Sequence, residues 1–179
     1  LFRSDGAQPM TSHDGRFVFL YNGEIYNYRD IRREIDDSAQ PAKWRGHSDT
    51  EVFLEGLARW GIRDTLRRVT GMFAFALWDR ERQELHLGRD RLGEKPLYWG
   101  VIDGDLVFAS ELHAMRAIPG FDPGVEPRAV AEYLRLGYVP APWSILRGVS
   151  KLRPGTVATF SRGTTGVAQR AEPDIYWSL

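Results

Sequence analysis

The chain has 179 residues with 24 basic and 24 acidic side chains, so its formal net charge is zero. With 42% hydrophobic residues, this composition is typical of a globular domain and excludes disorder and a nucleic-acid partner. The absence of cysteine excludes disulfides, thiolate metal sites and a cysteine nucleophile within these residues. No apolar run reaches the roughly 20 residues of a membrane span, no signal-peptide pattern opens the sequence, and no histidines pair at metal-ligand spacing. We therefore expect a cytoplasmic protein without a membrane span or metal site.

The first predicted strand is the apolar run over residues 17–21. Asn22-Gly23 follows and predicts a turn, because glycine accepts positive φ and asparagine tolerates the left-handed region. Such a turn would let the Asn22 side chain and the Gly23 N–H donate to one carbonyl oxygen, which is the geometry of an oxyanion hole. Glu24 adds a negative charge suited to a ligand ammonium group. From these residues alone, an ordinary hairpin turn with Glu24 in solvent is the alternative.

Capping residues mark the helices that follow. Asn27 is a suitable N-cap for a helix that extends to about Asp37. Ser48 and Glu51 have the spacing of a capping box, which predicts a second helix that ends at Gly61. The predicted helices cover residues 28–37, 49–60 and 64–69 and, further along the chain, 111–117 and 128–136.

An almost unbroken apolar run over residues 71–78 predicts a strand that is buried on both faces, at the centre of a sheet. Asp103-Gly104 predicts the turn of a later hairpin. The other predicted strands cover residues 84–89, 97–101, 106–110 and 155–161. Strands and helices occur in blocks, not in strict alternation, so the sequence predicts an α+β fold built from layers.

Five motifs occur in order along the chain. They are Asn22-Gly23-Glu24-Ile25-Tyr26-Asn27, Ser48-Asp49-Thr50-Glu51, Gly71-Met72-Phe73-Ala74-Phe75-Ala76, Arg89-Asp90-Arg91-Leu92-Gly93-Glu94-Lys95-Pro96-Leu97-Tyr98 and Phe108-Ala109-Ser110-Glu111. Together they resemble the glutamine amidotransferase domain of asparagine synthetase, of class II or the N-terminal-nucleophile (Ntn) type. The resemblance continues through residues 137–142 and 151–155, so it covers nearly the whole chain.

The resemblance implies a four-layer αββα sandwich of the Ntn-hydrolase type, with its first strands missing. Residues 1–172 would form a partial amidotransferase domain, and residues 173–179 would start a linker to a synthetase domain. In this family an N-terminal cysteine attacks the side-chain amide of glutamine, and the resulting thioester is hydrolysed to glutamate. The released ammonia converts ATP-activated aspartate to asparagine in the synthetase domain. ATP and Mg²⁺ are thus implied for that domain, and no cofactor is implied for this chain.

The same resemblance assigns the candidate site. Asn22 and Gly23 match the oxyanion-hole positions, and Glu24 and Asp49 match the positions that hold the α-ammonium group of glutamine. Asp49 has a structural alternative, because an acid in the first turn of a helix is favoured whatever its function.

A second cluster of charged residues follows the predicted central strands. We expect Arg89 and Asp90 to form an internal ion pair that braces the turn at Gly93, and Lys95 to be structural.

The chain departs from the family at both ends. The opening cysteine and the following Arg-Gly-Pro-Asp and His-x-Arg-Leu stretches are absent, and residues 6–10 match the segment that comes just after them. Leu1 cannot act as the nucleophile, so we expect the isolated chain to be inactive. We also expect it to have poor stability or to associate with itself, because the missing strands would expose a sheet edge and apolar faces. No Ser-Gly-Gly pyrophosphate loop of the synthetase domain occurs before Leu179.

Two explanations compete for the missing cysteine. The chain is either part of a working amidotransferase or a non-catalytic scaffold or docking domain, as in β-lactam synthetase-like proteins. The intact site residues favour the first explanation. Amidotransferases that make glucosamine phosphate or phosphoribosylamine are a further alternative, but the Glu-Ile-Tyr-Asn and Lys-Pro-Leu-Tyr segments favour the asparagine synthetase branch. The implied partners are glutamine and the synthetase domain, and a homodimer is compatible with the resemblance.

Overall fold

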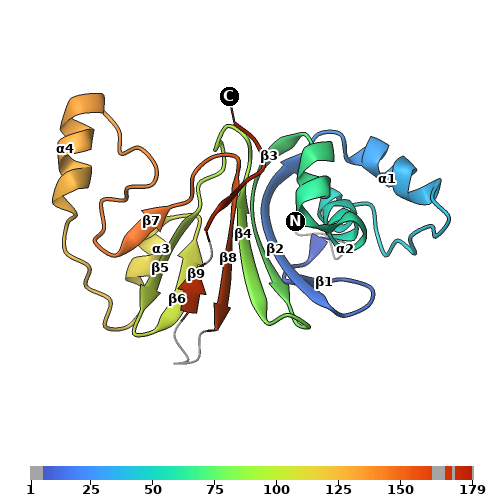
Figure 1. The fold of residues 1–179 in the computed structure, drawn as a ribbon, viewed down its shortest axis with the longest axis horizontal. Coiled ribbons are helices and arrows are strands. Elements are labelled where there is room, and N and C mark those ends of the chain that lie inside the picture. The colour runs from blue at the N-terminus through green and yellow to red at the C-terminus, as the bar shows by residue number, and fades with distance from the viewer. Residues whose placement is uncertain (1–5, 163–167, 171, 179) are drawn as a thin grey trace.

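The computed structural model describes residues 6–162, 168–170 and 172–178. Its elements are β1 (Met10–Thr11), β2 (Phe17–Ile25), α1 (Tyr28–Asp36), α2 (Asp49–Arg68), β3 (Gly71–Asp79), β4 (Glu84–Arg89), β5 (Tyr98–Ile102), β6 (Asp105–Ala109), α3 (Leu112–Arg116), α4 (Pro127–Leu136), β7 (Val149–Lys151), β8 (Thr156–Arg162), β9 (Ala168–Arg170) and β10 (Asp174–Ile175). Among these residues the larger sheet has the order β1-β2-β3-β4-β8-β10, with β9 beside β8. The smaller sheet has the order β6-β5-β7. Figure 1 shows α1 and α2 on the outer face of the larger sheet.

Three apolar clusters show how the layers stack. The first lies between the helices α1 and α2 and the larger sheet, and it includes Phe19 and Phe53. The second lies between the two sheets, where Ala76 and Phe108 pack. The third joins the smaller sheet to α3 through Met115. The order of helix, sheet, sheet and helix confirms the predicted four-layer αββα architecture.

Strand β3 lies inside the larger sheet, between β2 and β4, as predicted. Five consecutive residues from Phe73 to Leu77 are buried, which confirms a strand covered on both faces. Phe73 and Phe75 pack among the helices, whereas Ala74 and Ala76 face the smaller sheet. The small alanine side chains allow the two sheets to approach each other closely.

The predicted turn at Asn22-Gly23 is wrong, because both residues lie within β2. This strand pairs with β3 along its whole length, from Phe17 to Ile25. Gly23 does not have positive φ. Glycine is needed there for a different reason: a Cβ atom at Gly23 would lie 2.2 Å from the Met72 carbonyl oxygen. A Cβ atom at Gly71 would likewise lie 2.1 Å from the Glu24 backbone carbonyl oxygen. The two glycines therefore permit a close approach of the β2 and β3 backbones.

The two predicted helices α1 and α2 are confirmed, with one change in capping. Asn27 precedes α1, but its side chain bonds the backbone of Arg68 and Thr70 instead of capping the helix. Ser48 caps α2 as predicted, because its hydroxyl accepts the Glu51 N–H at 3.2 Å. Gly61 has φ 77° and separates α2 into the two predicted helical segments.

The β5–β6 hairpin is also confirmed, since Asp103 and Gly104 both have positive φ at its turn. Strands of two or three residues, such as β1 and β10, were not predicted. β10 pairs with β8, and the buried Tyr176 donates its hydroxyl to the Arg89 carbonyl oxygen at 2.7 Å. Residues 174–176 thus pack on the larger sheet, while a domain boundary at residue 173 stays a prediction.

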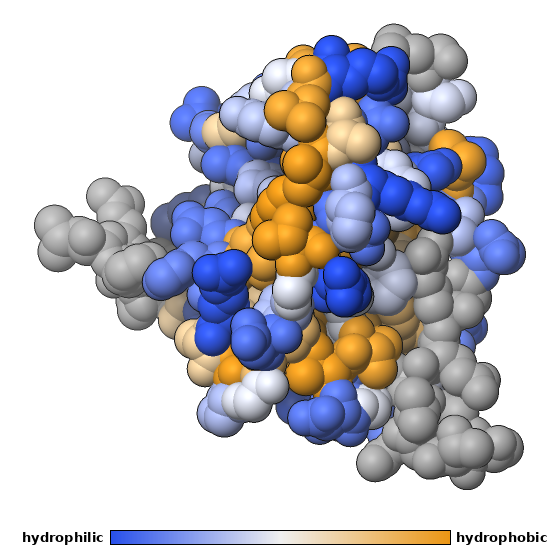
Figure 2. Space-filling model, turned by 90° about the vertical axis from the view of Figure 1, so that its left-hand side faces the viewer, coloured by the Kyte–Doolittle hydropathy of each residue, from blue (hydrophilic) through white to orange (hydrophobic). Residues whose placement is uncertain are grey.

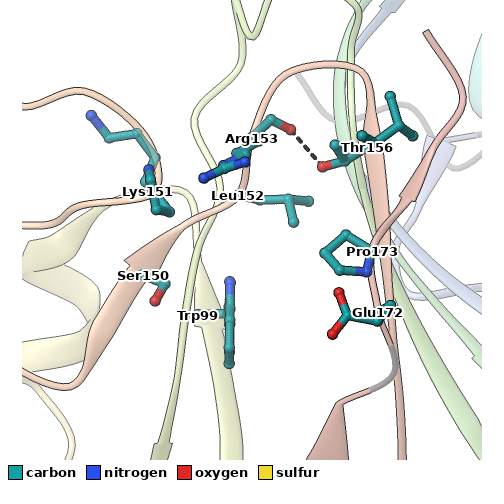
Figure 3. A pocket seen from close by; sticks show the side chains of 10 residues that line it. Trp99, Ser150, Lys151, Leu152, Arg153, Thr156, Glu172 and Pro173 are labelled. Atoms are coloured by element: carbon teal, nitrogen blue, oxygen red, sulfur yellow. Dashed lines mark hydrogen bonds between the residues drawn. The ribbon is translucent and has the colours of Figure 1, made fainter. Parts of the chain in front are cut away.

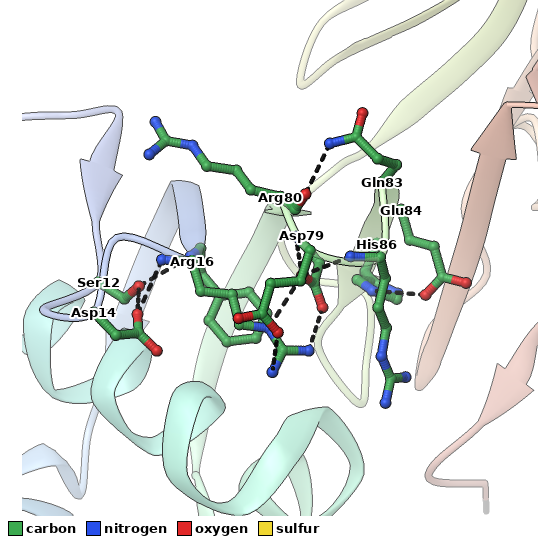
Figure 4. Close-up of polar contacts among 11 residues, drawn as sticks. Ser12, Asp14, Arg16, Asp79, Arg80, Gln83, Glu84 and His86 are labelled. Carbon is green, nitrogen blue, oxygen red and sulfur yellow. Dashed lines mark hydrogen bonds and ion pairs between the residues drawn. The ribbon is translucent and has the colours of Figure 1, made fainter.

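A partly buried ion pair between Arg16 and Asp79 fixes the hairpin between β3 and β4 (Figure 4). The Asp79 carboxylate accepts hydrogen bonds from Arg16 Nε at 3.1 Å and Nη2 at 2.6 Å. It also accepts the N–H groups of Glu81 and Arg82. The hydrogen bond with Arg16 lowers the pKa of Asp79 below the ordinary value. The ion pair connects the hairpin to the loop that precedes β2.

Helix α4 stands apart from the sheets and exposes apolar side chains. Figure 2 shows a stripe of hydrophobic residues on the face of the molecule that carries this helix. Leu134 is 79% exposed, and Ala129 is the one α4 residue that is buried. Within the described ranges, no helix is both long enough and apolar enough to span a membrane.

Candidate functional site

The three candidate residues of the first motif lie at the end of β2. Side chains alternate along a strand, and Tyr21 and Ile25 are buried against the helices. Asn22 and Glu24 are exposed and point to the opposite face of the sheet. Gly23 lies between them with no side chain. The strand thus presents an amide, an open backbone position and a carboxylate in sequence.

The edge of β2 that faces away from β3 carries a row of backbone donors. β1 covers this edge only at Val18 and Phe19. Further along the strand, the Tyr21 N–H donates to Gln8 Oε1 at 2.6 Å, and the Ile25 N–H donates to Asp49 Oδ2 at 2.9 Å. In an antiparallel ladder the N–H groups of alternate residues point to the same edge. The Gly23 N–H therefore points to this edge too, between two donors that protein side chains already occupy. Within the described part of the chain, no side-chain or loop oxygen accepts a hydrogen bond from the Gly23 N–H.

Asn22 connects the two sheets. Its Nδ2 donates to the hydroxyl of Ser110 at 3.2 Å, and Ser110 directly follows β6 of the smaller sheet. Both residues line a cavity of about 160 Å³ between β2, β3 and β6. Ala74 and Ala76 form part of its wall, so small side chains leave this space open. A primary amide carries two hydrogens, so the second N–H of Asn22 can serve a ligand.

Asp49 lies in the first turn of α2 and has a structural role. Its Oδ2 accepts hydrogen bonds from the Ile25 N–H and from the Tyr21 hydroxyl, each at 2.9 Å. Burial, together with the nearby Asp49 charge, raises the pKa of Tyr21, which stays a neutral donor. In the described ranges, no hydrogen bond or ion pair engages Asp49 Oδ1. Asp49 thus joins helix to strand with one oxygen and leaves the other for a ligand.

The Glu24 carboxylate is exposed and lies one residue from the Ile25 N–H that Asp49 binds. No ion pair or hydrogen bond holds Glu24 among the residues that the structure describes. Two carboxylates therefore flank the end of β2 with oxygens that are not used by the protein. This arrangement suits a cationic group such as an ammonium.

The predicted ion pair between Arg89 and Asp90 is wrong, although the turn at Gly93 is braced as expected. The Arg89 guanidinium donates to the carbonyl oxygens of Gly93, Lys95 and Leu152 at 2.5 to 2.7 Å. Burial lowers the pKa of Arg89. This segment connects β4 of the larger sheet to β5 of the smaller sheet (Figure 1).

The fully buried Asp90 braces the same segment from the other side. Its carboxylate accepts the N–H groups of Phe73, Leu92, Glu94 and Lys95 at 2.9 to 3.2 Å. Arg89 and Asp90 each bind backbone groups, so both are structural. Lys95 takes part through its backbone, in agreement with its predicted structural role.

The described residues also line a larger cavity, of about 400 Å³, between strands of the two sheets (Figure 3). Trp99, Lys151, Arg153 and Glu172 contribute to its lining. Asn22 and the other candidate residues do not line it, so cavity size alone would have pointed away from the predicted site. The motif residues, not this larger cavity, identify the candidate site.

Three residues of the site were not predicted. Gln8 occupies the Tyr21 N–H, Ser110 contacts Asn22, and Tyr21 contacts Asp49. Gln8 and Ser110 lie in segments that carry the family resemblance, which was the available signal for them. Within the described ranges, no group of three or more histidine and acidic side chains could hold a metal ion.

Comparison with known proteins agrees with this geometry. Residues 2–174 match the model of the glutamine amidotransferase domain family. The chain is 36% identical over 177 residues to "asparagine synthetase [glutamine-hydrolyzing] 3" of Bacillus subtilis, covering 97% of this chain and 27% of that protein. It is 40% identical over 146 residues to a putative asparagine synthetase of Mycobacterium tuberculosis H37Rv, covering 80% of this chain and 22% of that protein. The chain thus spans about a quarter of the length of these relatives.

The fold is that of known amidotransferases. The B. subtilis glutamine phosphoribosylpyrophosphate amidotransferase superposes with a TM-score of 0.65 at 18% identity, covering 98% of this chain and 33% of that chain. A structure described as the allosteric regulatory enzyme of purine biosynthesis gives 0.64 at 17% identity, covering 98% and 32%. These neighbours confirm the predicted Ntn type of fold. The chain belongs to the glutamine amidotransferase domain family, as a homologue of the amidotransferase part of glutamine-hydrolysing asparagine synthetases.

Proposed function

We propose that this chain binds L-glutamine at the end of β2, as the glutaminase part of an asparagine synthetase. The observation that carries the proposal is the open Gly23 N–H between two occupied backbone donors. The side-chain carbonyl oxygen of glutamine would accept hydrogen bonds from Gly23 N–H and Asn22 Nδ2. Its α-ammonium group would pair with Glu24 and with Asp49 Oδ1.

The hydrogen bonds from these two donors would be strongest when negative charge develops on the amide oxygen in the transition state. Attack on the amide carbon converts the carbonyl oxygen to an oxyanion, and fixed donors stabilise that charge without rearranging. Loss of one such donor typically costs about 3 kcal/mol of transition-state stabilisation. The strand β2 holds Gly23 rigidly through its pairing with β3, so the donor needs no ordering step.

The attacking group is not among these residues, because the chain contains no cysteine. We therefore expect the 179 residues by themselves to bind glutamine without hydrolysing it. A coupled assay that detects glutamate released by the purified chain tests this. Release above a protein-free blank would contradict the expectation.

We further propose that the longer protein uses ammonia from glutamine to amidate aspartate, in a synthetase domain that binds ATP and Mg²⁺. The support for this role is the similarity to proteins described as glutamine-hydrolysing asparagine synthetases. A cytoplasmic location and homodimer formation also stay predictions.

A scaffold or docking domain is the second candidate, favoured by the absence of cysteine. Calorimetric titration separates the two, since a binding site should give saturable heat with L-glutamine and little with D-glutamine. Glu24→Gln should weaken binding, whereas Asp105→Asn, which also removes a carboxylate from an exposed residue, should not. The absence of saturable heat with L-glutamine would favour the scaffold.

A further inference from the structure

We infer that Ser110 is a positioning residue that holds the Asn22 carboxamide for the side-chain oxygen of glutamine. The inference rests on the proposed function of Asn22. Ser110 lies 88 positions after Asn22 in the sequence, yet its hydroxyl oxygen accepts a hydrogen bond from Asn22 Nδ2 at 3.2 Å. This contact comes from the smaller sheet, whereas Asn22 belongs to the larger one.

Asn22 has no other side-chain hydrogen bond within the described ranges, and it is exposed on its strand. An exposed asparagine can rotate about two side-chain bonds and can exchange the positions of its oxygen and nitrogen atoms. Only the nitrogen end can donate to a glutamine oxygen. The hydroxyl of Ser110 takes one N–H of Asn22 and leaves the second N–H with a defined direction.

Ser110 is itself held in place by its position in the fold. It directly follows β6, whose last residue Ala109 pairs with Tyr98 of β5. It comes just before α3, which packs on the smaller sheet through the buried Met115. Ser110 is therefore fixed at both ends by ordered elements, and a fixed partner can restrict Asn22.

The space beside this contact fits the proposed ligand group. Asn22 and Ser110 line the cavity of about 160 Å³, together with the apolar Leu97 and Phe108. A water molecule has about 30 Å³ of liquid volume, so this cavity has room for the few heavy atoms of a side-chain amide. The contact therefore lies where it can select for a side-chain carbonyl.

Two ligands separate positioning from general binding. L-Norvaline has the α-amino and α-carboxylate groups of glutamine but lacks a carbonyl on its side chain. The Ser110→Ala variant should weaken L-glutamine binding about threefold to tenfold, as expected for one neutral hydrogen bond. Its affinity for L-norvaline should be unchanged. Ser110→Thr, which keeps a hydroxyl, should restore the affinity for glutamine.

The measurement is an NMR titration of the ¹⁵N-labelled chain with both ligands. Ser150→Ala, on β7 of the same sheet and away from this cavity, is the matched control. In the absence of ligand, Ser110→Ala should also shift the Asn22 Nδ2 resonances, whereas Ser150→Ala should not. If the unaltered chain binds glutamine and Ser110→Ala binds it equally well, the positioning role is wrong. If the unaltered chain does not bind glutamine, the proposed function itself is wrong, and this inference fails with it.

Discussion

The Asp49 carboxylate accepts the Ile25 N–H at 2.9 Å, so the first turn of α2 is joined to the last residue of β2. The same oxygen accepts the Tyr21 hydroxyl. The residue that the family resemblance assigns to the ligand ammonium thus also holds the edge of the strand that carries the other ligand groups. The structural role uses Oδ2, and the proposed binding role would use Oδ1 of the same side chain.

Two substitutions of Asp49 should separate these roles. Asp49→Asn keeps an oxygen for the Ile25 N–H and the Tyr21 hydroxyl but removes the negative charge, so it should weaken L-glutamine binding with little loss of stability. Asp49→Ala removes both hydrogen bonds and should lower the free energy of unfolding by about 1 to 3 kcal/mol. Urea unfolding and calorimetric titration of both variants test this. Equal stability of the two variants would argue against the structural role.

Gly23→Ala should be strongly destabilising, because the added Cβ atom would lie 2.2 Å from the Met72 backbone oxygen. Backbone atoms cannot move aside without breaking the pairing of β2 with β3. We expect a loss of at least about 2 kcal/mol in the free energy of unfolding. Gly6→Ala is the control, since no atom lies within 4 Å of its Cβ position. Similar chemical unfolding midpoints for both variants would refute the close approach.

Asp79 should make stability depend on pH. Its pKa in the folded state is lowered, chiefly by the hydrogen bond from Arg16, relative to the ordinary value of 3.8. The stabilisation is thus present above pH 3.8 and is lost as the pH falls through the lower folded-state pKa. The difference in unfolding free energy between the unaltered chain and Asp79→Asn should be constant at neutral pH and should shrink in acid. Urea unfolding across this range measures it, and a difference that does not change with pH would contradict the assignment.

Leu134→Ser should reduce association of the chain without reducing its stability. Leu134 is 79% exposed on α4, so replacing its side chain should change the free energy of unfolding little. Exposed apolar side chains of this kind promote association between molecules. Sedimentation and thermal unfolding of the variant test the two parts. As a control, Leu146→Ser, at a 3% exposed position, should lower the melting temperature.

Much of the fold was predictable because its signals are local. The apolar run of β3 and the Asp103-Gly104 turn are each determined by residues that are neighbours in the sequence. The prediction of a turn at Asn22-Gly23 is wrong because a glycine in a strand and a glycine in a turn look alike in sequence. Only the distance to Met72, 49 positions away, shows which one applies. Strands of two residues, such as β1, carry too few side chains to show a period.

The candidate site was predictable in part for the same reason. Asn22, Gly23 and Glu24 are adjacent in sequence, so one motif identified them. The partners that complete the site come from far along the chain: Gln8 is 13 positions from Tyr21, and Ser110 is 88 positions from Asn22. No periodicity or spacing rule connects such residues before the sheets are assembled.

The central claim is that the Gly23 N–H is an open donor for the side-chain oxygen of glutamine. The most direct test is to follow the backbone amide resonances of the ¹⁵N-labelled chain during titration with L-glutamine. The Gly23 amide proton should move downfield and saturate together with the Asn22 side-chain amide. The amides of Tyr21 and Ile25, already bonded to Gln8 and Asp49, should move much less. A Gly23 resonance that stays unchanged at saturating L-glutamine would contradict the account.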